Sequence, residues 1–420
     1  MIKELTRKAK IAKGVLVEGG ITEFLISVLR FSERQIENLL RRGKQKQAKH
    51  LINTRANYTE ILNANFLNSK SSYKATKKGP YSVAWVIPPP GKGSGGHMNI
   101  YRFIKFLEEA GHACHIYIYT NTAKPGDLEK LHVMMGDSYP EIVAKMSWIT
   151  SSRQIKEHDA IFATSWETAY VVFNAPRASK KFYFVQDFEP FFYPRGSFYY
   201  LAENTYRFNF FGITAGKWLA NKLSSEFGMR CGHYDFGYDK TAYFLKNTGK
   251  RKEIFFYARP ITERRGLEMG ILALDIFHKQ HPDYIINFAG WDMSDYEIPF
   301  PYENQGIVEI GNLNELYNRC VLALVLSYTN MSLLPIELLG SGTIPVVNNS
   351  PNNYEVSDNK YIKYTDNNPI SLAAAMDEIV TNKLQIDYAR KAAESVKQTG
   401  WNRSGSAFIE LFENEMKIND

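Results

Sequence analysis

The chain has 420 residues, of which 44% are hydrophobic, 14% aromatic and 23% charged, with a formal net charge of +7. This length suits two domains, and this composition excludes a disordered chain for most of the length. The longest apolar run, residues 320–326, is far shorter than the ~20 residues of a membrane-spanning helix. The three cysteines, Cys114, Cys231 and Cys320, are widely spaced and odd in number. They exclude a zinc ribbon and a fully paired disulfide scaffold, and they indicate the cytosol.

Residues 1–78 are distinct from the rest in charge. They hold 17 Lys and Arg against 6 Glu, a net +11, whereas the remaining residues carry a net −4. The first residues lack the apolar stretch of a secretory signal, and apolar residues recur at helical spacing from Phe24 to Leu40. We therefore expect a basic helical extension. It either packs as a plain helix or docks on an anionic membrane surface or a partner protein, whereas nucleic-acid binding is disfavoured because no recognition motif accompanies the charge.

From residue 79 onward the chain alternates short apolar runs with helical patterns. The runs in the first half predict strands at 82–87, 115–119, 159–164, 181–186 and 210–214. The runs in the second half predict strands at 253–258, 283–290, 306–311, 320–327 and 343–347. Their β-branched and aromatic content, without strict alternation, is typical of buried parallel strands.

This alternation of strand and helix occurs twice, which predicts two doubly wound α/β domains. We place the N-terminal domain at 79–248 and the C-terminal domain at 249–398. Residues 399–420 are expected to form a helix that packs back on the N-terminal domain. In such folds ligands bind beyond the carboxyl ends of the strands, and two domains bind them between each other.

The first candidate motif, PPPGKGSGGHMN at 88–99, directly follows the first predicted strand. Gly95 and Gly96 let a ligand approach the backbone, and the helix that follows offers free N–H groups, which together suit a phosphate. The stretch also matches the dinucleotide pattern GxGxxG, but the second strand ends in Tyr-Thr-Asn, without the acid that a nicotinamide ribose needs. A plain flexible turn is the alternative. His97, at the helix start, is expected to be structural or to face the acceptor.

The second candidate motif, YARPITERRGLEMG at 257–270, joins a strand end to a helix start. Arg259 leaves the strand and Arg265 precedes the helix, with Arg264 able to share their role. Guanidinium groups at such a place can hold a diphosphate in forked geometry and stabilise it as a leaving group. Solvated surface arginines are the alternative.

The third motif, LSYTNMSLLPIELLGSGTIPVV at 326–347, contains Glu337 on a short apolar helix. A carboxylate in the sequence LLPIELLG is costly to bury without a partner. The hydroxyl groups of a sugar or ribose would satisfy it, and a structural carboxylate at the helix start is the alternative.

The fourth motif, at 182–211, holds 14 aromatic residues in 30. Gln186 and Asp187 follow a predicted strand end, and Glu189 comes two residues later. Aromatic rings beside carboxylates suit carbohydrate recognition, because sugar C–H faces pack on rings while hydroxyl groups bond to acids. We expect Asp187 to orient or deprotonate the acceptor, with Glu189 behind it. A bulky core with a solvated acid pair is the alternative.

The order of Gly-rich loop, Arg…Arg-Gly and PxE…GxxPVV resembles the retaining GT-B glycosyltransferases of family 4. More narrowly, IPPPGKGSGGHMN, FVQDFEPFFYPRGSFYYLAENTYR and FYARP resemble bacterial rhamnosyltransferases of surface-glycan assembly that use dTDP-β-L-rhamnose. The resemblance covers about residues 80–415. It implies two Rossmann-like domains facing a cleft, in addition to the helical extension. The N-terminal domain would bind the acceptor and the C-terminal domain the nucleotide sugar.

Carried over to this chain, the resemblance assigns the donor to Gly95, Gly96, Arg259, Arg265, Leu313, Met331, Ser332, Leu333 and Glu337. The arginines would bind the diphosphate, Glu337 the ribose, the backbone around Leu313 the base, and the loop at 331–333 the phosphates and sugar. It assigns the acceptor to His97, Gln186, Asp187 and Glu189.

Two positions depart from the family. The usual second acid, eight residues before Glu337, is Thr329, which puts the sugar contacts in question, and the usual Lys before Gly is Arg265.

These patterns predict a metal-independent, cofactor-free retaining glycosyltransferase. The sequence contains no HExxH, no GxSxG and no DxD at a nucleotide site. The enzyme would move L-rhamnose onto a growing, lipid-linked bacterial surface glycan. It would be cytoplasmic and peripheral on the inner face of the membrane, with no nucleic-acid partner. The alternatives are another nucleotide-sugar donor, an NAD-type oxidoreductase and a non-catalytic GT-B scaffold.

Overall fold

The computed structural model describes residues 56–418 except 68–72, 75–77, 92–93, 122–127, 130, 132–138, 177–178 and 384. Most of the predicted basic extension therefore lies outside the described residues, including the helix expected at 24–40. No helix among the described residues is long and apolar enough to cross a bilayer.

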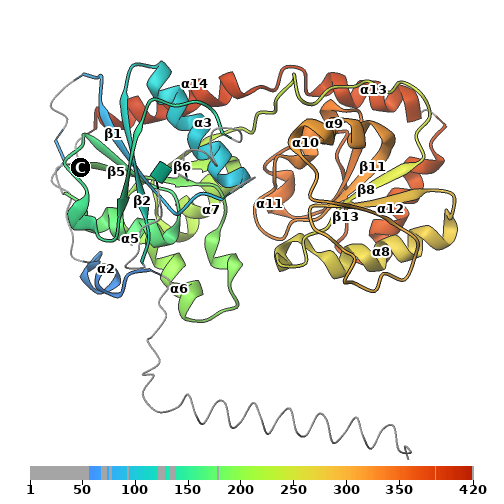
Figure 1. Ribbon diagram of the computed structural model, residues 1–420, viewed down its shortest axis with the longest axis horizontal. Helices are drawn as coiled ribbons and strands as arrows, with labels where there is room; N and C mark the ends of the chain where they lie inside the picture. Colours follow the sequence, from blue (N-terminus) through green and yellow to red (C-terminus); the bar gives the residue numbers. More distant parts are fainter. Residues whose placement is uncertain are drawn as a thin grey trace, which may run out of the picture. The chain divides into compact units, whose positions relative to one another are not determined.

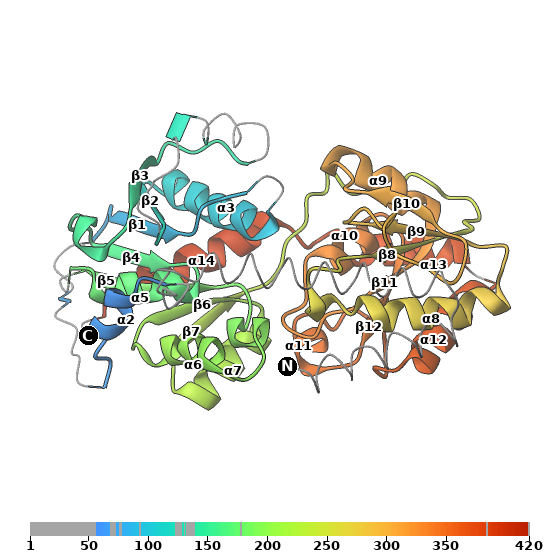
Figure 2. The ribbon, with the colours of Figure 1, turned by 60° about the horizontal axis from the view of Figure 1, so that its bottom comes forward.

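The N-terminal domain is built on a seven-stranded parallel sheet in the order β3-β2-β1-β4-β5-β6-β7. Its strands are β1 (Ser82–Ile87), β2 (Ala113–Tyr119), β3 (Lys145–Ile149), β4 (Ala160–Ala163), β5 (Lys180–Val185), β6 (Phe211–Ala215) and β7 (Cys231–Tyr234). Helices α3 (Gly95–Glu109) and α14 (Trp401–Met416) cover one face, and α5 (Trp166–Asn174) and α7 (Lys217–Phe227) cover the other (Figure 1). The short helix α6 (Ser197–Asn204), drawn in Figure 2, is attached to α5 because the Tyr170 hydroxyl donates to the Leu201 carbonyl at 3.0 Å.

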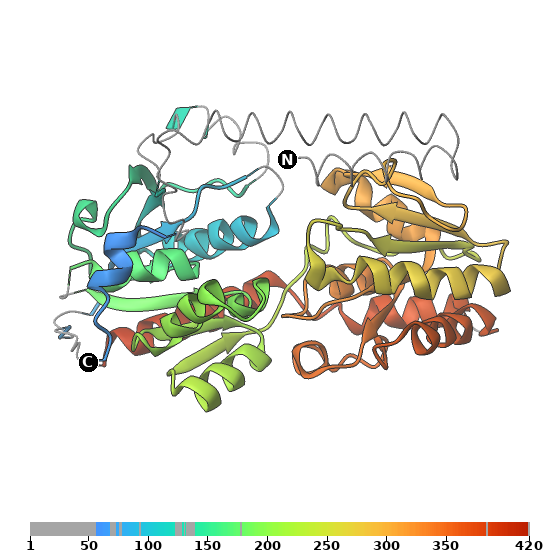
Figure 3. The same cartoon turned by 90° about the horizontal axis from the view of Figure 1, so that it is seen from below.

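The C-terminal domain is built on a six-stranded parallel sheet in the order β10-β9-β8-β11-β12-β13. Its strands are β8 (Glu253–Tyr257), β9 (Ile285–Ala289), β10 (Glu303–Gly306), β11 (Cys320–Val325), β12 (Ile344–Asn348) and β13 (Lys363–Thr365). Its helices are α8 (Leu267–Gln280), α9 (Ile310–Arg319), α10 (Leu334–Gly340), α11 (Pro351–Tyr354), α12 (Pro369–Thr381) and α13 (Gln385–Ser395). Helices α8 and α12 share one face of this sheet (Figure 3).

Both sheets agree with the predicted pair of doubly wound domains, and one predicted strand is wrong. Instead of a strand at 306–311, β10 ends at Gly306, and Glu309 is the N-cap of α9. The apolar pattern misled because Ile307 and Ile310 are exposed. The sequence also missed β3, β7 and β13, which are short, half-exposed edge strands without an apolar run.

Aromatic side chains fill the core of the N-terminal domain. Trp85 of β1 stacks on Phe162 of β4 with ring centroids 4.3 Å apart. Phe408 of α14 packs against both rings, so the helix expected at 399–420 supplies part of this core. The buried Glu415 of α14 also forms an ion pair with Lys180 of β5 at 2.8 Å.

Helix α2 (Tyr58–Asn63) belongs to the N-terminal domain although it lies within the predicted extension 1–78. Its buried Glu60 accepts hydrogen bonds from the Ser152 N–H at 2.8 Å and from Asn174 Nδ2 at 2.7 Å. These bonds attach α2 to the start of a short 3₁₀ turn and to the end of α5, so the domain begins before residue 79.

Candidate functional site

The candidate site lies at the carboxyl ends of the strands, where ligands of such sheets bind. In the N-terminal domain it comprises the ends of β1, β5 and β6. In the C-terminal domain it comprises the ends of β8 and β11. Hydrogen bonds join the two ends: the Asn330 N–H donates to Asp187 Oδ1 at 2.9 Å, and Thr329 Oγ1 donates to Asp187 Oδ2 at 3.0 Å.

Three arginines cluster after β8, as the sequence predicted for a diphosphate. Arg265 Nη1 donates to Ser327 Oγ at 3.2 Å, and Arg259 Nη1 donates to the Tyr257 hydroxyl at 3.3 Å. The buried Nε of Arg259 has no partner among the described residues. Burial lowers the pKa of Arg265, and Arg264 and Arg259 add to that shift. This surplus of positive charge is suited to an anion with several oxygens.

A left-handed glycine makes the arginine turn possible. Gly266 has φ +61°, and a Cβ there would lie 2.9 Å from a ring carbon of Tyr328. Only glycine combines this conformation with such close approach. The turn therefore presses Arg264 and Arg265 against the loop that follows β11.

Glu337 lies on α10 with a carboxylate that accepts no hydrogen bond from the described residues. Burial raises its pKa to about 7, and the nearby Arg102 of α3 opposes that shift. The side chain is half-buried, so its oxygens lose part of their hydration and stay within reach of a ligand that supplies donors. The hydroxyl groups of a ribose or sugar would do so, as predicted from the sequence.

The loop before α3 is closed by its own residues. His97 Nδ1 lies 2.8 Å from Ser94 Oγ, and His97 Nε2 lies 3.1 Å from the Pro88 carbonyl oxygen. Burial lowers the pKa of His97, and the neutral ring with the proton on Nε2 satisfies both contacts. The structural role foreseen for His97 is the one this geometry offers, since no ring nitrogen is left for an acceptor.

Gln186, which follows β5, lies against the start of α3, where Gly95 and Gly96 are the first two residues. Gln186 Nε2 donates to the Gly96 carbonyl at 3.0 Å, and Asn99 Nδ2 donates to Gln186 Oε1 at 3.2 Å. A Cβ on Gly95 would meet nothing within 4 Å. Both glycines are exposed, so the backbone at Gly95 is open to a ligand, whereas the carbonyl of Gly96 is already bonded to Gln186.

Asp187 accepts hydrogen bonds from donors of both domains. Besides Asn330 and Thr329, it accepts from the Phe188 N–H at 2.8 Å, and Arg264 Nε lies 3.7 Å from Oδ2. Burial raises the pKa of Asp187, and Arg264 opposes the shift. Thr329, which stands where the resemblance would place a second acid, donates instead to this acid of the other domain.

Glu189 requires a correction to the predicted acceptor site. It is 6% exposed, and its carboxylate accepts from the Trp166 N–H at 2.8 Å and the Tyr183 hydroxyl at 3.1 Å. Burial raises its pKa well above the usual range. Glu189 thus caps the start of α5 inside the domain and does not stand behind Asp187.

Most of the 14 aromatic residues at 182–211 belong to the core, as the alternative interpretation expected. The exposed exceptions are Phe191, Phe192 and Tyr200. Phe192 lies at the site, because the Arg264 guanidinium stands 4.1 Å above its ring centroid.

The remaining predicted donor residues flank this cluster. Met331 is buried, and its N–H donates to the Asn352 carbonyl at 3.1 Å. Ser332 and Leu333 are half-buried directly before α10, and Leu313 lies on α9 against the core. Leu313 follows no strand of the predicted kind, since α9 begins at Ile310.

Arg102 and Asn330 are two residues of the site that the sequence did not predict. Arg102 Nη1 donates to Asn99 Oδ1 at 2.6 Å, and its guanidinium stacks 3.8 Å from the Trp401 ring centroid. Within a helical pattern, Arg102 had no feature that distinguished it from a solvated residue. Asn330 donates to backbone carbonyls more than 100 residues away in sequence, which no local pattern reveals.

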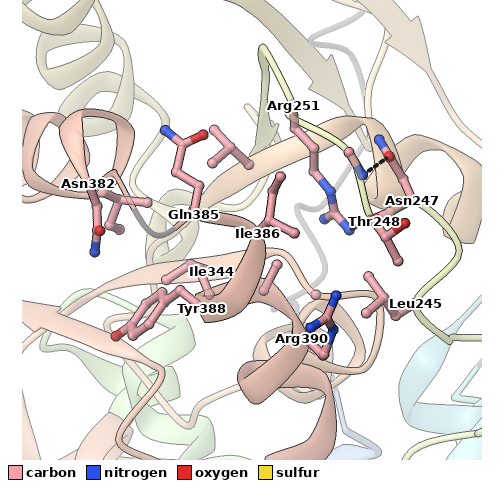
Figure 4. Close-up of a pocket in the computed structure, with 15 residues that line it drawn as sticks. Leu245, Asn247, Thr248, Arg251, Ile344, Asn382, Gln385, Ile386, Tyr388 and Arg390 are labelled. Atoms are coloured by element: carbon pink, nitrogen blue, oxygen red, sulfur yellow. Dashed lines mark hydrogen bonds between the residues drawn. The ribbon is translucent and has the colours of Figure 1, made fainter.

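Among the described residues, no group of three or more His, Cys, Asp and Glu side chains could hold a metal ion. A cavity lies at the opposite, amino end of the C-terminal sheet, beside Arg251, Gln385 and Arg390 (Figure 4). Arg251 precedes β8 and Ile344 begins β12, so this cavity is separate from the arginine cluster.

Two domain families match the chain. The family described as WsaF, C-terminal domain, matches residues 252–380, and the family described as WsaF, N-terminal domain, matches residues 132–214. The first range contains the arginine cluster and Glu337. The second contains Gln186 and Asp187.

A curated relative extends the similarity over both domains. The chain is 28% identical to the O-antigen biosynthesis protein RfbC of Myxococcus xanthus over 330 residues, which is 76% of this chain. The match spans only 26% of that longer relative.

Solved structures share the fold. HepE from Anabaena, in complex with UDP-glucose, gives a TM-score of 0.62 at 12% identity, covering 81% of this chain and 100% of its own. TarM, which a related structure assigns to S. aureus, gives 0.63 at 10% identity, covering 80% and 99%. A glycosyltransferase from Rickettsia africae gives 0.55 at 14% identity, covering 81% and 99%. At these identities the likeness shows the arrangement of two Rossmann-like domains.

Proposed function

We propose that this chain, which has the GT-B fold and matches both WsaF domain families, is a glycosyltransferase of bacterial surface-polysaccharide assembly. The observation that carries the proposal is that Arg259 and Arg265 follow β8, while Glu337, whose carboxylate accepts no hydrogen bond from the described residues, lies on the helix that follows β11. Cations for a diphosphate and an acceptor for hydroxyl groups are the complement of a nucleotide-diphospho-sugar. Both lie at the carboxyl edge of one sheet.

The donor we propose is dTDP-β-L-rhamnose, and its support is the sequence resemblance described above. The titles of the solved relatives name UDP-glucose and UDP, so a uridine nucleotide is the first competing donor. The acceptor we propose is a growing surface glycan, supported by the O-antigen function in the name of the relative from Myxococcus xanthus. A lipid-linked acceptor, cytoplasmic location and docking on the inner membrane face through residues 1–78 remain part of the proposal.

The mechanism we propose is substitution with retention on one face of the sugar. The bond between the anomeric carbon and the diphosphate oxygen breaks while the acceptor oxygen bonds to the same carbon. The proton of the acceptor hydroxyl passes to the departing diphosphate oxygen. Arg259 and Arg265 stabilise the charge that develops on that oxygen. No protein nucleophile and no bound cofactor enter this scheme.

Binding to the purified chain tests the proposal. A thermal-shift panel would contain dTDP, UDP, GDP, dTDP-β-L-rhamnose and NAD. A ligand at ~100 times its dissociation constant stabilises the folded state by about 2.7 kcal/mol, which raises the melting temperature measurably. Selective stabilisation by dTDP and its sugar supports the donor assignment. A shift only with UDP or GDP would mean that the donor carries that nucleotide instead of dTDP. A shift only with NAD would favour an oxidoreductase, and no shift with any ligand would favour a non-catalytic scaffold.

A pair of arginine variants sharpens this test. Arg259→Ala should abolish the shift by sugar nucleotides, because it removes a cation from the diphosphate site. Arg390→Ala removes an exposed arginine at the opposite end of the same sheet and should preserve the shift. Equal losses in both variants would contradict the site.

A further inference from the structure

The loop that follows β11 crosses into the N-terminal domain. Asn330 Nδ2 donates to the Gln186 carbonyl at 3.0 Å and to the Ala215 carbonyl at 2.8 Å. These carbonyls stand at the ends of β5 and β6. Together with the two bonds to Asp187, four hydrogen bonds therefore tie one loop of the C-terminal domain to the edge of the N-terminal sheet.

This contact is buried. Thr329 is 1% exposed and Asn330 is 2% exposed, while the Asp187 side chain retains 15%. A buried donor or acceptor that loses its partner pays the full cost of desolvation. The loop cannot leave the N-terminal domain without exposing several such groups at once.

The same loop holds the arginines of the donor site. The Tyr328 N–H donates to the Arg264 carbonyl at 3.0 Å, and Ser327 Oγ accepts from Arg265. Ser327 Oγ in turn donates to the Asn330 carbonyl at 2.9 Å. A displacement of Asn330 is thus transmitted to the Arg265 guanidinium through Ser327, and Tyr328 of the same loop holds the backbone of Arg264.

Three of the lone-pair sites of the Asp187 carboxylate are occupied by protein donors, and the remaining site on Oδ2 faces Arg264. A carboxylate offers about four lone-pair sites. The N–H groups of Phe188 and Asn330 occupy Oδ1, while Thr329 and Arg264 face Oδ2. Its geometry is that of a structural acceptor between domains.

We propose that Asp187 and Asn330 are positioning residues, an interdomain joint that sets Arg264 and Arg265 for the donor diphosphate. The joint consists of Asp187, Thr329 and Asn330. The proposal rests on the proposed function for its effect on catalysis, but the joint itself exists without a ligand. It replaces the general-base role that the sequence predicted for Asp187.

Amide hydrogen exchange of the full chain without ligand measures the joint directly, because the Asn330 N–H is one of its bonds. In Asp187→Ala, exchange at residue 330 should rise at least about tenfold. In Asn330→Ala, exchange over residues 326–333 should rise similarly. Asp187→Asn should stay within about threefold of wild type, because its carbonyl still accepts from both N–H groups and its amide can donate to Thr329. The matched control is Asn221→Ala, which removes an exposed interdomain bond to Glu355 and should change nothing at 330.

Turnover separates positioning from base catalysis. The assay is hydrolysis of the sugar nucleotide that binds wild type, dTDP-β-L-rhamnose in our proposal. Both alanine variants should lower kcat, and the double variant should lower it no further than the worse single variant, because both break one joint. Asp187→Asn should recover most of the rate and leave the pH profile in place.

Two results overturn the proposal. One is unchanged exchange at residue 330 in both alanine variants. The other is an Asp187→Asn variant that keeps its protection at 330 and yet loses as much kcat as Asp187→Ala, which would make Asp187 a base. Failure of wild type to bind any sugar nucleotide would refute the proposed function instead, and the exchange experiment would still decide whether the joint exists.

Discussion

The acidic residues at the carboxyl edges of the two sheets differ in whether protein groups donate hydrogen bonds to them. At the edge of the N-terminal sheet, the carboxylates of Asp187 and Glu189 both accept hydrogen bonds from protein donors. At the edge of the C-terminal sheet, Glu337 accepts no hydrogen bond from the described residues, and Arg259 keeps a buried Nε without a partner. Groups with protein partners hold the fold together, whereas groups without them are left for a ligand. The contrast predicts that variants on the first edge lose stability and those on the second lose binding.

The largest effect is expected for Glu189→Ala. It strands the Trp166 N–H and the Tyr183 hydroxyl in the core and should cost about 2–4 kcal/mol of unfolding free energy. Urea denaturation measures the loss. Glu189→Gln keeps an acceptor for Trp166 and a partner for Tyr183, and should cost less than about 1 kcal/mol. Equal losses in the two variants would show that the cap is not the reason for burial.

Arg265→Ala, in contrast to Glu189→Ala, should weaken ligand binding more than it lowers stability. It removes a charged hydrogen-bond donor worth about 1.5–3 kcal/mol, so nucleotide diphosphate binding should weaken about 10- to 100-fold. Its unfolding free energy should fall less than that of Glu189→Ala, because relief of the buried charge and of repulsion from Arg264 and Arg259 partly offsets the lost bond to Ser327 and the lost attraction to Asp187. Calorimetric titration and urea denaturation of the same preparation check both halves. A stability loss with intact binding would remove the distinction between the edges.

The pH dependence of Glu337 gives a third, smaller effect. Its folded-state pKa of about 7 lies above the ordinary value of 4.5, so the folded chain holds an extra proton between these values. Unfolding free energy therefore falls as pH rises from about 4.5 to about 7. Glu337→Gln removes this fall and should be about 1–3 kcal/mol more stable than wild type at pH 8, with little difference at pH 4.5. Parallel curves for both proteins would contradict the burial of a free carboxylate.

Phe192→Ala should have the smallest effect. The exposed ring contributes a cation–π contact to Arg264 worth about 0.5–1 kcal/mol. Donor affinity should fall about two- to fivefold with little loss of stability. Phe192→Tyr keeps the ring face and should match wild type. A larger fall would mean that the aromatic ring, rather than Asp187, fixes Arg264.

How well each part of the fold and of the site can be predicted depends on how far apart in the sequence its interacting residues lie. Buried central strands such as β1 and β11 are continuous apolar runs, which the sequence pattern predicts correctly. The edge strand β10 is polar, and the strand predicted for this part of the chain was placed at the apolar residues that follow it. Arg259 was placed correctly at a strand end, because strand order alone determines which edge it reaches. The local turn decides the rest: a 3₁₀ turn (Glu189–Phe192) carries Glu189 into the core only two residues after Asp187.

Long-range partners could not be read from the chain. Thr329 looked like a missing acid, and only the fold shows that an acid 142 residues earlier meets its hydroxyl. Asn330 carries no motif at all, since its partners are backbone carbonyls of another domain.

Helix α14 also determines the order in which the domains can mature during synthesis. The N-terminal sheet ends at Tyr234, yet Phe408 and Phe412, which cover its core, are made after the whole C-terminal domain. More than 150 further residues are therefore translated before α14 can cover the aromatic face of the N-terminal sheet. The N-terminal domain is thus synthesised first but completed last, and the C-terminal domain can fold before α14 packs on the N-terminal sheet.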